Sequence, residues 1–179
     1  MLYLIIFKRL KSNYMTKVFH ALFILFLFAS CKTTTYYISR HAERAGTMSN
    51  DPQLTPEGEK QALDLRDYLK NKSIKGVYST NYNRTRATAQ PTSTYFNLPV
   101  NIYNPQQANA MLDSLKAVNQ NNILIVGHSN TVDDIVNRLM GTNTLTDLPE
   151  TEYGSLFIVR KKGSNYTYEK IKVPQTTPR

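Results

Sequence analysis

Two histidines and two arginines stand where strands of a predicted sheet end. Arg40-His41 directly follows an extended run, His128 follows the most apolar of the expected strands, and Arg84 follows a third run. Ligands of open α/β sheets bind beyond the carboxyl ends of the strands, so these four side chains are expected to face one site. Guanidinium groups match phosphate oxygens, and an imidazole nitrogen can act as a nucleophile. The pattern therefore predicts a phosphate pocket that contains a nitrogen nucleophile.

Three segments resemble the signature segments of the histidine phosphatase (phosphoglycerate mutase-like) superfamily. They are Arg40-His41, residues 79–89 and Gly127-His128-Ser129. Residues 54–58 also resemble the small single-domain bacterial members, the type that includes phosphohistidine phosphatases. The resemblance runs from about Tyr36 to Val159, and it implies that His41 is phosphorylated during turnover.

Phosphoryl transfer depends mostly on positioning and on charge stabilisation around the transferring group. Arg40 and Arg84 offer guanidinium forks to the phosphate, His128 adds a donor, and Ser129 offers a backbone N–H. Neighbouring cations lower the pKa of His41, which favours the neutral nucleophile. We therefore predict catalytic roles for His41, Arg40, Arg84 and His128, and substrate contacts from Arg40, Arg84, His128 and Ser129. The scheme requires neither a metal nor an organic cofactor.

A general acid must protonate the leaving oxygen, and the sequence offers few candidates. The only acid between the second and third segments is Asp113, inside a predicted helix. Glu43, two residues past the nucleophile, is the preferred candidate, and Asp51 is the next. If no acid serves, the enzyme favours substrates with good leaving groups, such as phosphohistidine or acyl phosphates.

Strands and helices alternate along the chain. This order predicts a three-layer α/β/α sandwich with a mostly parallel sheet and an antiparallel edge or C-terminal hairpin. A Thr-Pro-Glu start predicts the first helix, and a Gly in the turn predicts the hairpin. The expected strands cover residues 34–39, 76–79, 100–103, 123–126, 155–160 and 166–173. The expected helices cover residues 55–70, 83–96, 104–115 and 131–140.

The N-terminal segment resembles a bacterial lipoprotein signal peptide. Residues 18–29 are apolar except for His20, follow Lys17, and are too short to span a bilayer as a helix. Cys31 is the only cysteine and follows Ala-Ser, as in a lipobox, although Phe28 replaces the usual Leu. The alternatives are an uncleaved membrane anchor or an ordinary secretory signal with a chance cysteine.

The predicted organisation follows from this segment. Residues 1–30 form the signal peptide, with a true start at Met1 or Met15, and residues 31–35 form the anchor and a short linker. The phosphatase domain is assigned to residues 36–173, and residues 174–179 form a tail.

Charge and export narrow the predicted function. Without the leader the chain has 18 basic and 13 acidic residues, a net charge of +5 that suits an anionic substrate. We predict an exported, periplasm-facing phosphatase, lipid-anchored at Cys31, that acts on a phosphorylated small molecule rather than a phosphoprotein, with no nucleic-acid partner. The alternatives are a catalytically silent phosphate-binding or scaffold lipoprotein and a mutase-like phosphotransferase. A mutase is disfavoured because the chain lacks the long insertion that larger mutases use to hold a bisphosphate.

Overall fold

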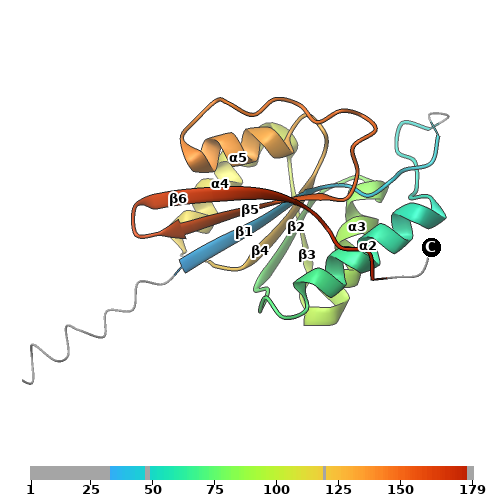
Figure 1. Ribbon diagram of the computed structural model, residues 1–179, viewed down its shortest axis with the longest axis horizontal. Coiled ribbons are helices and arrows are strands. Elements are labelled where there is room, and N and C mark those ends of the chain that lie inside the picture. Colours follow the sequence, from blue (N-terminus) through green and yellow to red (C-terminus); the bar gives the residue numbers. More distant parts are fainter. Residues whose placement is uncertain (1–32, 47–48, 119, 177–179) are drawn as a thin grey trace, which may run out of the picture. The chain divides into compact units, whose positions relative to one another are not determined.

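Six strands form one mixed sheet in this computed structural model, which describes residues 33–46, 49–118 and 120–176. The strand order is β3-β2-β4-β1-β5-β6 (Figure 1). Strands β1 to β4 are parallel to one another, whereas β5 and β6 are antiparallel to their neighbours. The strands are β1 (Thr33–Arg40), β2 (Gly76–Thr80), β3 (Val100–Tyr103), β4 (Ile123–Gly127), β5 (Ser155–Lys162) and β6 (Asn165–Lys172).

Helices cover both faces of this sheet. They are α2 (Pro56–Leu69), α3 (Asn83–Phe96), α4 (Ala108–Ala117) and α5 (Val132–Met140), with a 3₁₀ turn η1 (Pro105–Gln107) before α4. In Figure 1, α4 and α5 lie on one face, and α2 and α3 lie on the other. The arrangement confirms the predicted three-layer α/β/α sandwich with a mostly parallel sheet.

Alternating side chains of the strands divide the core into two layers. Tyr36 and Ile38 of β1 pack in a cluster with residues of α4 and α5, such as Leu112 and Ile135. Tyr37 points to the opposite face and packs in a second cluster with α2 and α3. A strand buried on both faces carries apolar residues in succession rather than in alternation. The two layers therefore explain the unbroken apolar sequence of β4.

Local signals fix the helix ends as the sequence predicted. The Thr55 hydroxyl accepts a hydrogen bond from the Gly58 N–H at 2.9 Å, and Pro56 occupies the first helical position of α2. Helix α4 differs in one respect. The helix expected to open at Asn104-Pro105 starts with η1, because the Asn104 side chain accepts from the Gln106 N–H and caps the tighter turn.

Thr176 holds the C-terminal segment to the domain. Residues 174–176 have no regular structure, but the Thr176 N–H donates to the Asp64 carboxylate at 2.7 Å. The predicted leader, including Cys31, lies outside the described residues. Among the residues that are described, no helix is long and apolar enough to cross a membrane.

Candidate active site

The ends of β1 and β4 bring the two histidines together. Arg40 is in register with Gly127, and the His41 N–H donates to the Gly127 carbonyl at 2.9 Å. The His41 and His128 rings, which follow these strands, have centroids 5.7 Å apart. Both side chains line one pocket of about 990 Å³. The sequence prediction that the strand ends converge is therefore confirmed by the fold.

Gly127 lets the loop after β4 approach its neighbours closely. A Cβ atom at this position would lie 2.9 Å from the Thr131 hydroxyl and 3.0 Å from the Tyr103 hydroxyl. The Thr131 hydroxyl accepts a hydrogen bond from the His128 N–H at 3.0 Å. A larger residue at 127 would push against the turn that holds His128.

One hydrogen bond fixes the tautomer of His41. Its Nδ1 lies 2.7 Å from the Ala42 carbonyl, which can only accept, so Nδ1 carries the proton. In the neutral ring, Nε2 is then left with a free lone pair. Burial lowers the pKa of His41 to about 3, and the charges of Arg40 and Arg84 act in the same direction. At neutral pH the residue is therefore a neutral imidazole with a nucleophilic nitrogen.

His128 has partners on both ring nitrogens. The Arg84 guanidinium donates to Nδ1 at 3.3 Å, so in the neutral ring Nε2 carries the proton and donates to the Thr80 hydroxyl at 2.9 Å. Burial and the charge of Arg84 lower the pKa of His128 to about 4, which favours this neutral form. In this arrangement His128 orients Arg84 as well as lining the pocket.

The loop before β5 holds Arg40 from the other side. Nη1 of Arg40 donates to the carbonyl oxygens of Pro149, Glu150 and Glu152 at 2.9, 3.0 and 3.1 Å. Nη2 donates to the Glu150 carboxylate at 2.8 Å. Four acceptors fix the plane of this guanidinium, whose side chain is only 1% exposed.

The Nε atoms of Arg40 and Arg84 are two further hydrogen-bond donors at the site. Both Nε atoms are buried and have no hydrogen-bond partner within the described residues. A buried unpaired donor costs free energy, and most are satisfied in folded proteins. Because Arg40 and Arg84 both line the pocket, an oxyanion bound there is a suitable acceptor for these donors.

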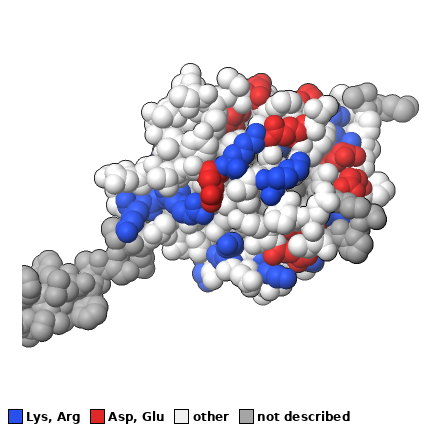
Figure 2. Space-filling view, in the orientation of Figure 1, with Lys and Arg blue, Asp and Glu red and all other residues white. Residues whose placement is uncertain are grey.

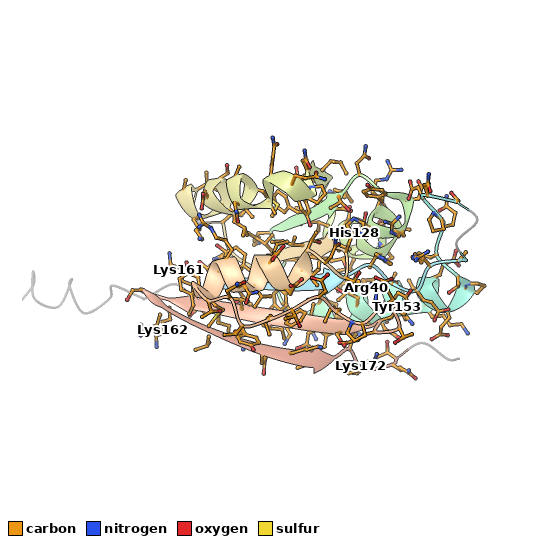
Figure 3. The ribbon with its side chains drawn as sticks, turned by 90° about the horizontal axis from the view of Figure 1, so that it is seen from above. Arg40, His128, Tyr153, Lys161, Lys162 and Lys172 are labelled. Atoms are coloured by element: carbon orange, nitrogen blue, oxygen red, sulfur yellow. The ribbon has the colours of Figure 1, made fainter. Side chains whose placement is uncertain are left out.

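Each arginine also packs on a tyrosine. The Arg40 guanidinium lies 4.5 Å from the centre of the Tyr153 ring, and that of Arg84 lies 4.5 Å from the centre of the Tyr82 ring. The Tyr82 ring in turn meets His128 edge-on, with centroids 4.9 Å apart. Figure 3 shows Arg40, His128 and Tyr153 at the same end of the sheet. The tyrosines restrict the two guanidinium planes that face the pocket.

Ser129 joins the site through a carboxylate. Its hydroxyl donates to Glu150 at 2.6 Å, and Glu150 also accepts from Arg40 and lies 3.9 Å from Arg44. The hydrogen bond from Ser129 and the charge of Arg40 lower the pKa of Glu150. This carboxyl is therefore ionised at neutral pH and cannot serve as the proton donor in that state.

The structure does not bring Glu43 into the pocket lining. Its carboxylate accepts a hydrogen bond from the Thr55 hydroxyl at 3.0 Å, at the start of α2. Its backbone packs so closely on Gly58 that a Cβ atom there would lie 2.0 Å from the Glu43 carbonyl oxygen. Glu43 thus supports the junction between the segment after β1 and helix α2.

The other two acids considered from the sequence have different surroundings. Asp51 accepts from the Asn83 N–H at 2.8 Å and lies 3.5 Å from Arg84, so it caps α3 beside the pocket. Asp113 pairs with Lys116 and Arg138 on α4 and α5. The carboxylates that line the pocket are Asp134, Asp147 and Glu150.

Sequence reasoning missed Tyr82, Tyr153 and Glu150. Tyr82 stands two residues before Arg84, but no periodicity marks its ring as a partner of the guanidinium. Tyr153 and Glu150 lie more than 100 positions from Arg40, in a segment without regular structure. Their contacts depend on the path of a loop, which no short motif predicts. Within the described ranges, no group of three His, Cys, Asp or Glu residues is arranged to hold a metal ion.

Comparisons with solved structures show a shared fold. The protein histidine phosphatase SixA, complexed with tungstate, is 20% identical with a TM-score of 0.63, covering 77% of this chain and 96% of its own. A mycobacterial glucosyl-3-phosphoglycerate phosphatase is 12% identical with a TM-score of 0.65, covering 80% and 100%. A phosphoserine phosphatase variant from Entamoeba histolytica is 13% identical with a TM-score of 0.64, and the match covers 80% of this chain and 100% of that protein.

A search of curated proteins found no match. The family model described as histidine phosphatase superfamily (branch 1) matches residues 36–104, which include Arg40, His41 and Arg84. The chain therefore resembles the histidine phosphatase superfamily over residues 36–104 and shares its fold with the three phosphatases above.

Proposed function

We propose that this protein is a phosphatase that hydrolyses phosphomonoesters through a phosphohistidine on His41. The observation that carries the proposal is the state of His41. The ring is neutral, its Nδ1–H donates to the Ala42 carbonyl, and it lines a pocket with two arginines whose Nε donors have no partner among the described residues. A pocket with this composition suits a phosphoryl group next to a nitrogen nucleophile.

The reaction has two steps. The Nε2 lone pair of His41 attacks phosphorus, the bond from phosphorus to the ester oxygen breaks, and the leaving oxygen takes a proton from water or from a carboxylic acid at the pocket, which the attacking water of the second step replaces. Water then attacks the phosphoimidazole, releases inorganic phosphate and restores the neutral ring. In both steps the guanidinium groups of Arg40 and Arg84 balance the charge on the transferring oxygens. Ser129 lies at the same wall of the pocket through its bond to Glu150.

We propose a phosphorylated small molecule as the substrate. A pocket of about 990 Å³ is large enough for a phosphoryl group with an organic moiety. The phosphatases that share the fold are named for different substrates, which are phosphohistidine in proteins, glucosyl-3-phosphoglycerate and phosphoserine. The shared fold therefore supports phosphatase chemistry and selects no single substrate.

Rapid quench with a labelled phosphoester tests the covalent step. We expect acid-labile label on the peptide that contains His41 within one turnover, and no label in His41→Asn. Label on His128 or Ser129 would contradict the proposal.

A catalytically silent phosphate-binding protein is a second candidate, because Glu150 is ionised and Glu43 lies outside the pocket lining. Phosphate binding without any turnover of p-nitrophenyl phosphate, a substrate with a good leaving group, would favour it.

If the protein is an active enzyme, its proton donor can be found by comparing the hydrolysis of alkyl and p-nitrophenyl phosphates. We expect Asp134→Asn or Asp147→Asn to slow the alkyl ester selectively, by about 10²-fold, and Glu43→Gln to affect both substrates equally.

We also propose that the chain is exported and lipid-anchored at Cys31, facing the periplasm. The support is in the sequence, where a basic residue and then residues 18–29, apolar except for His20 and ending in the Ala of Ala-Ser, precede this cysteine. Palmitate labelling of cells tests the anchor. Cys31→Ala should abolish labelling and leave a precursor or a released protein, whereas unchanged labelling would exclude the anchor.

A further inference from the structure

Four lysines gather at the end of the sheet opposite the pocket. Strand β5 runs antiparallel to β1, so Lys161 and Lys162 are in register with Thr34 and Thr33. The loop from α2 to β2 carries Lys72 and Lys75 to the same end, since Gly76 and Tyr36 both pair with Ile123. Figure 3 shows Lys161 and Lys162 at one end of the domain and Arg40, His128 and Tyr153 toward the other.

None of these four lysines forms an ion pair with a carboxylate in the part of the chain that the structure describes, a property that they share with Lys60, Lys70, Arg86 and Lys172. Arg160 pairs with Glu169 at 2.6 Å, and Lys170 pairs with Glu152 at 2.5 Å. The ammonium groups of Lys72 and Lys161 instead lie over tyrosine rings, at 5.3 and 5.8 Å from their centres. Their charge is therefore available to an external anion.

The charge distribution differs between the two ends. In Figure 2, Lys and Arg side chains group at the left of the domain, where the β5–β6 hairpin turns, with an acidic group beside them, while side chains of both signs are mixed over the middle and right of this face. The pocket is lined by the carboxylates of Asp134, Asp147 and Glu150 as well as by its arginines. An anionic surface would therefore attract the lysine end more strongly than the pocket, where three arginines and three carboxylates balance.

The first described residue lies at this lysine end. Thr33 begins β1, and Cys31 precedes it by two residues, a separation of at most about 7 Å. Thr33 and Arg40 are the first and last of the eight residues of β1, and the seven steps between them span about 23 Å at the usual rise. A chain anchored at Cys31 would hold the lysines near the lipid headgroups and the pocket well away from them.

We propose that Lys72, Lys75, Lys161 and Lys162 form a membrane-contact surface that binds anionic phospholipid headgroups. The orientation of the domain at the membrane depends on the proposed anchor at Cys31. The positive charge of the lysine surface does not depend on it. Each lysine near an anionic leaflet strengthens attraction by roughly five-fold, and the effect falls off within a Debye length. The surface sets the orientation of the domain, so that the pocket opens toward water and soluble phosphoesters.

Amine labelling of the full chain in vesicles tests this surface. The protein is reconstituted with phosphatidylcholine alone or with added phosphatidylglycerol, acetylated with a water-soluble reagent, and mapped by mass spectrometry. We expect the four lysines to react several-fold more slowly in the anionic vesicles, and high salt to remove this protection. Lys60, on the first half of α2, is the internal reference and should react equally in both.

Two further measurements test the anchor and the catalytic proposal independently of the lysine surface. Flotation with pure phosphatidylcholine vesicles reports the anchor, and hydrolysis of p-nitrophenyl phosphate reports the pocket. A variant with all four lysines changed to Gln should keep that hydrolysis and lose the preference for anionic vesicles. Equal labelling in the two kinds of vesicle would overturn the proposal. So would protection by DNA or an acidic protein with none by anionic lipid.

Discussion

The neutral state of His41 makes a quantitative prediction for the pH dependence of stability. The pKa of His41 is about 3 in the folded protein, against 6.5 for the free side chain, because the ring is buried. Between these values the unfolded chain binds a proton that the folded protein does not. Stability therefore falls as the pH drops from 6.5 to 3, and the contribution of His41 is fully present above pH 6.5.

The magnitude follows from the pKa shift. A difference of about 3.5 units corresponds to about 5 kcal/mol over the whole range, at about 1.4 kcal/mol per unit. Between pH 7.5 and pH 5, the titration of His41 lowers the free energy of unfolding by about 2 kcal/mol. His128, whose pKa is about 4, lowers the free energy of unfolding by a similar amount in this interval.

Urea unfolding of the full chain at pH 7.5 and pH 5, followed by circular dichroism, measures this loss. The variant His41→Asn is a close match, since the Asn amide can donate to the Ala42 carbonyl in place of Nδ1. We expect its free energy of unfolding to fall by about 2 kcal/mol less than that of the wild type over the same interval.

Two results would refute the reasoning. An equal loss in the two proteins would mean that His41 does not remain neutral when folded. A pH profile of kcat/KM with an acidic limb near 6.5, rather than near 3 to 4, would show the same for the free enzyme.

Three further predictions concern the groups around the nucleophile. Arg84→Ala should lower kcat/KM for alkyl and p-nitrophenyl phosphates alike by about 10²- to 10³-fold, because it removes charge stabilisation that both transition states need; a loss confined to the alkyl ester would contradict this. Tyr153→Leu should lower kcat/KM by about 2- to 30-fold through Arg40, whereas Tyr153→Phe keeps the ring and should be near wild type; equal losses would point to the hydroxyl instead. Gly58→Ala should lower the free energy of unfolding by about 1–3 kcal/mol in thermal or urea denaturation, while Gly46→Ala, where a Cβ meets nothing within 4 Å, should not.

Local chemistry explains why much of the fold could be predicted from the sequence. The Thr55-Pro56 start of α2 and the apolar run of β4 act within a few residues, and both elements appear where they were expected. The pocket was predictable in outline for a related reason. Arg40-His41 and His128 follow directly from strands, and parallel strands end at one edge.

Contacts between distant segments account for what the sequence could not show. Glu43 is close to the nucleophile in sequence, but its carboxylate is bound to Thr55 at the start of α2. Glu150 is distant in sequence, but it contacts Arg40 and Ser129 directly. Proximity along the chain is a poor guide to an acid in a pocket assembled from loops.

The position of β1 in the sheet has a consequence for synthesis. This strand is the first to leave the ribosome among those described, yet it lies between β4 and β5, which come late. Its apolar residues have no strand partner until residues 123–127 have been made, and Arg40 has none of its carbonyl acceptors until residues 149–152 have followed. A nascent chain therefore presents an unpaired apolar strand for most of its elongation, which makes it a target for chaperones, and it gains a complete phosphate pocket only near the end of translation.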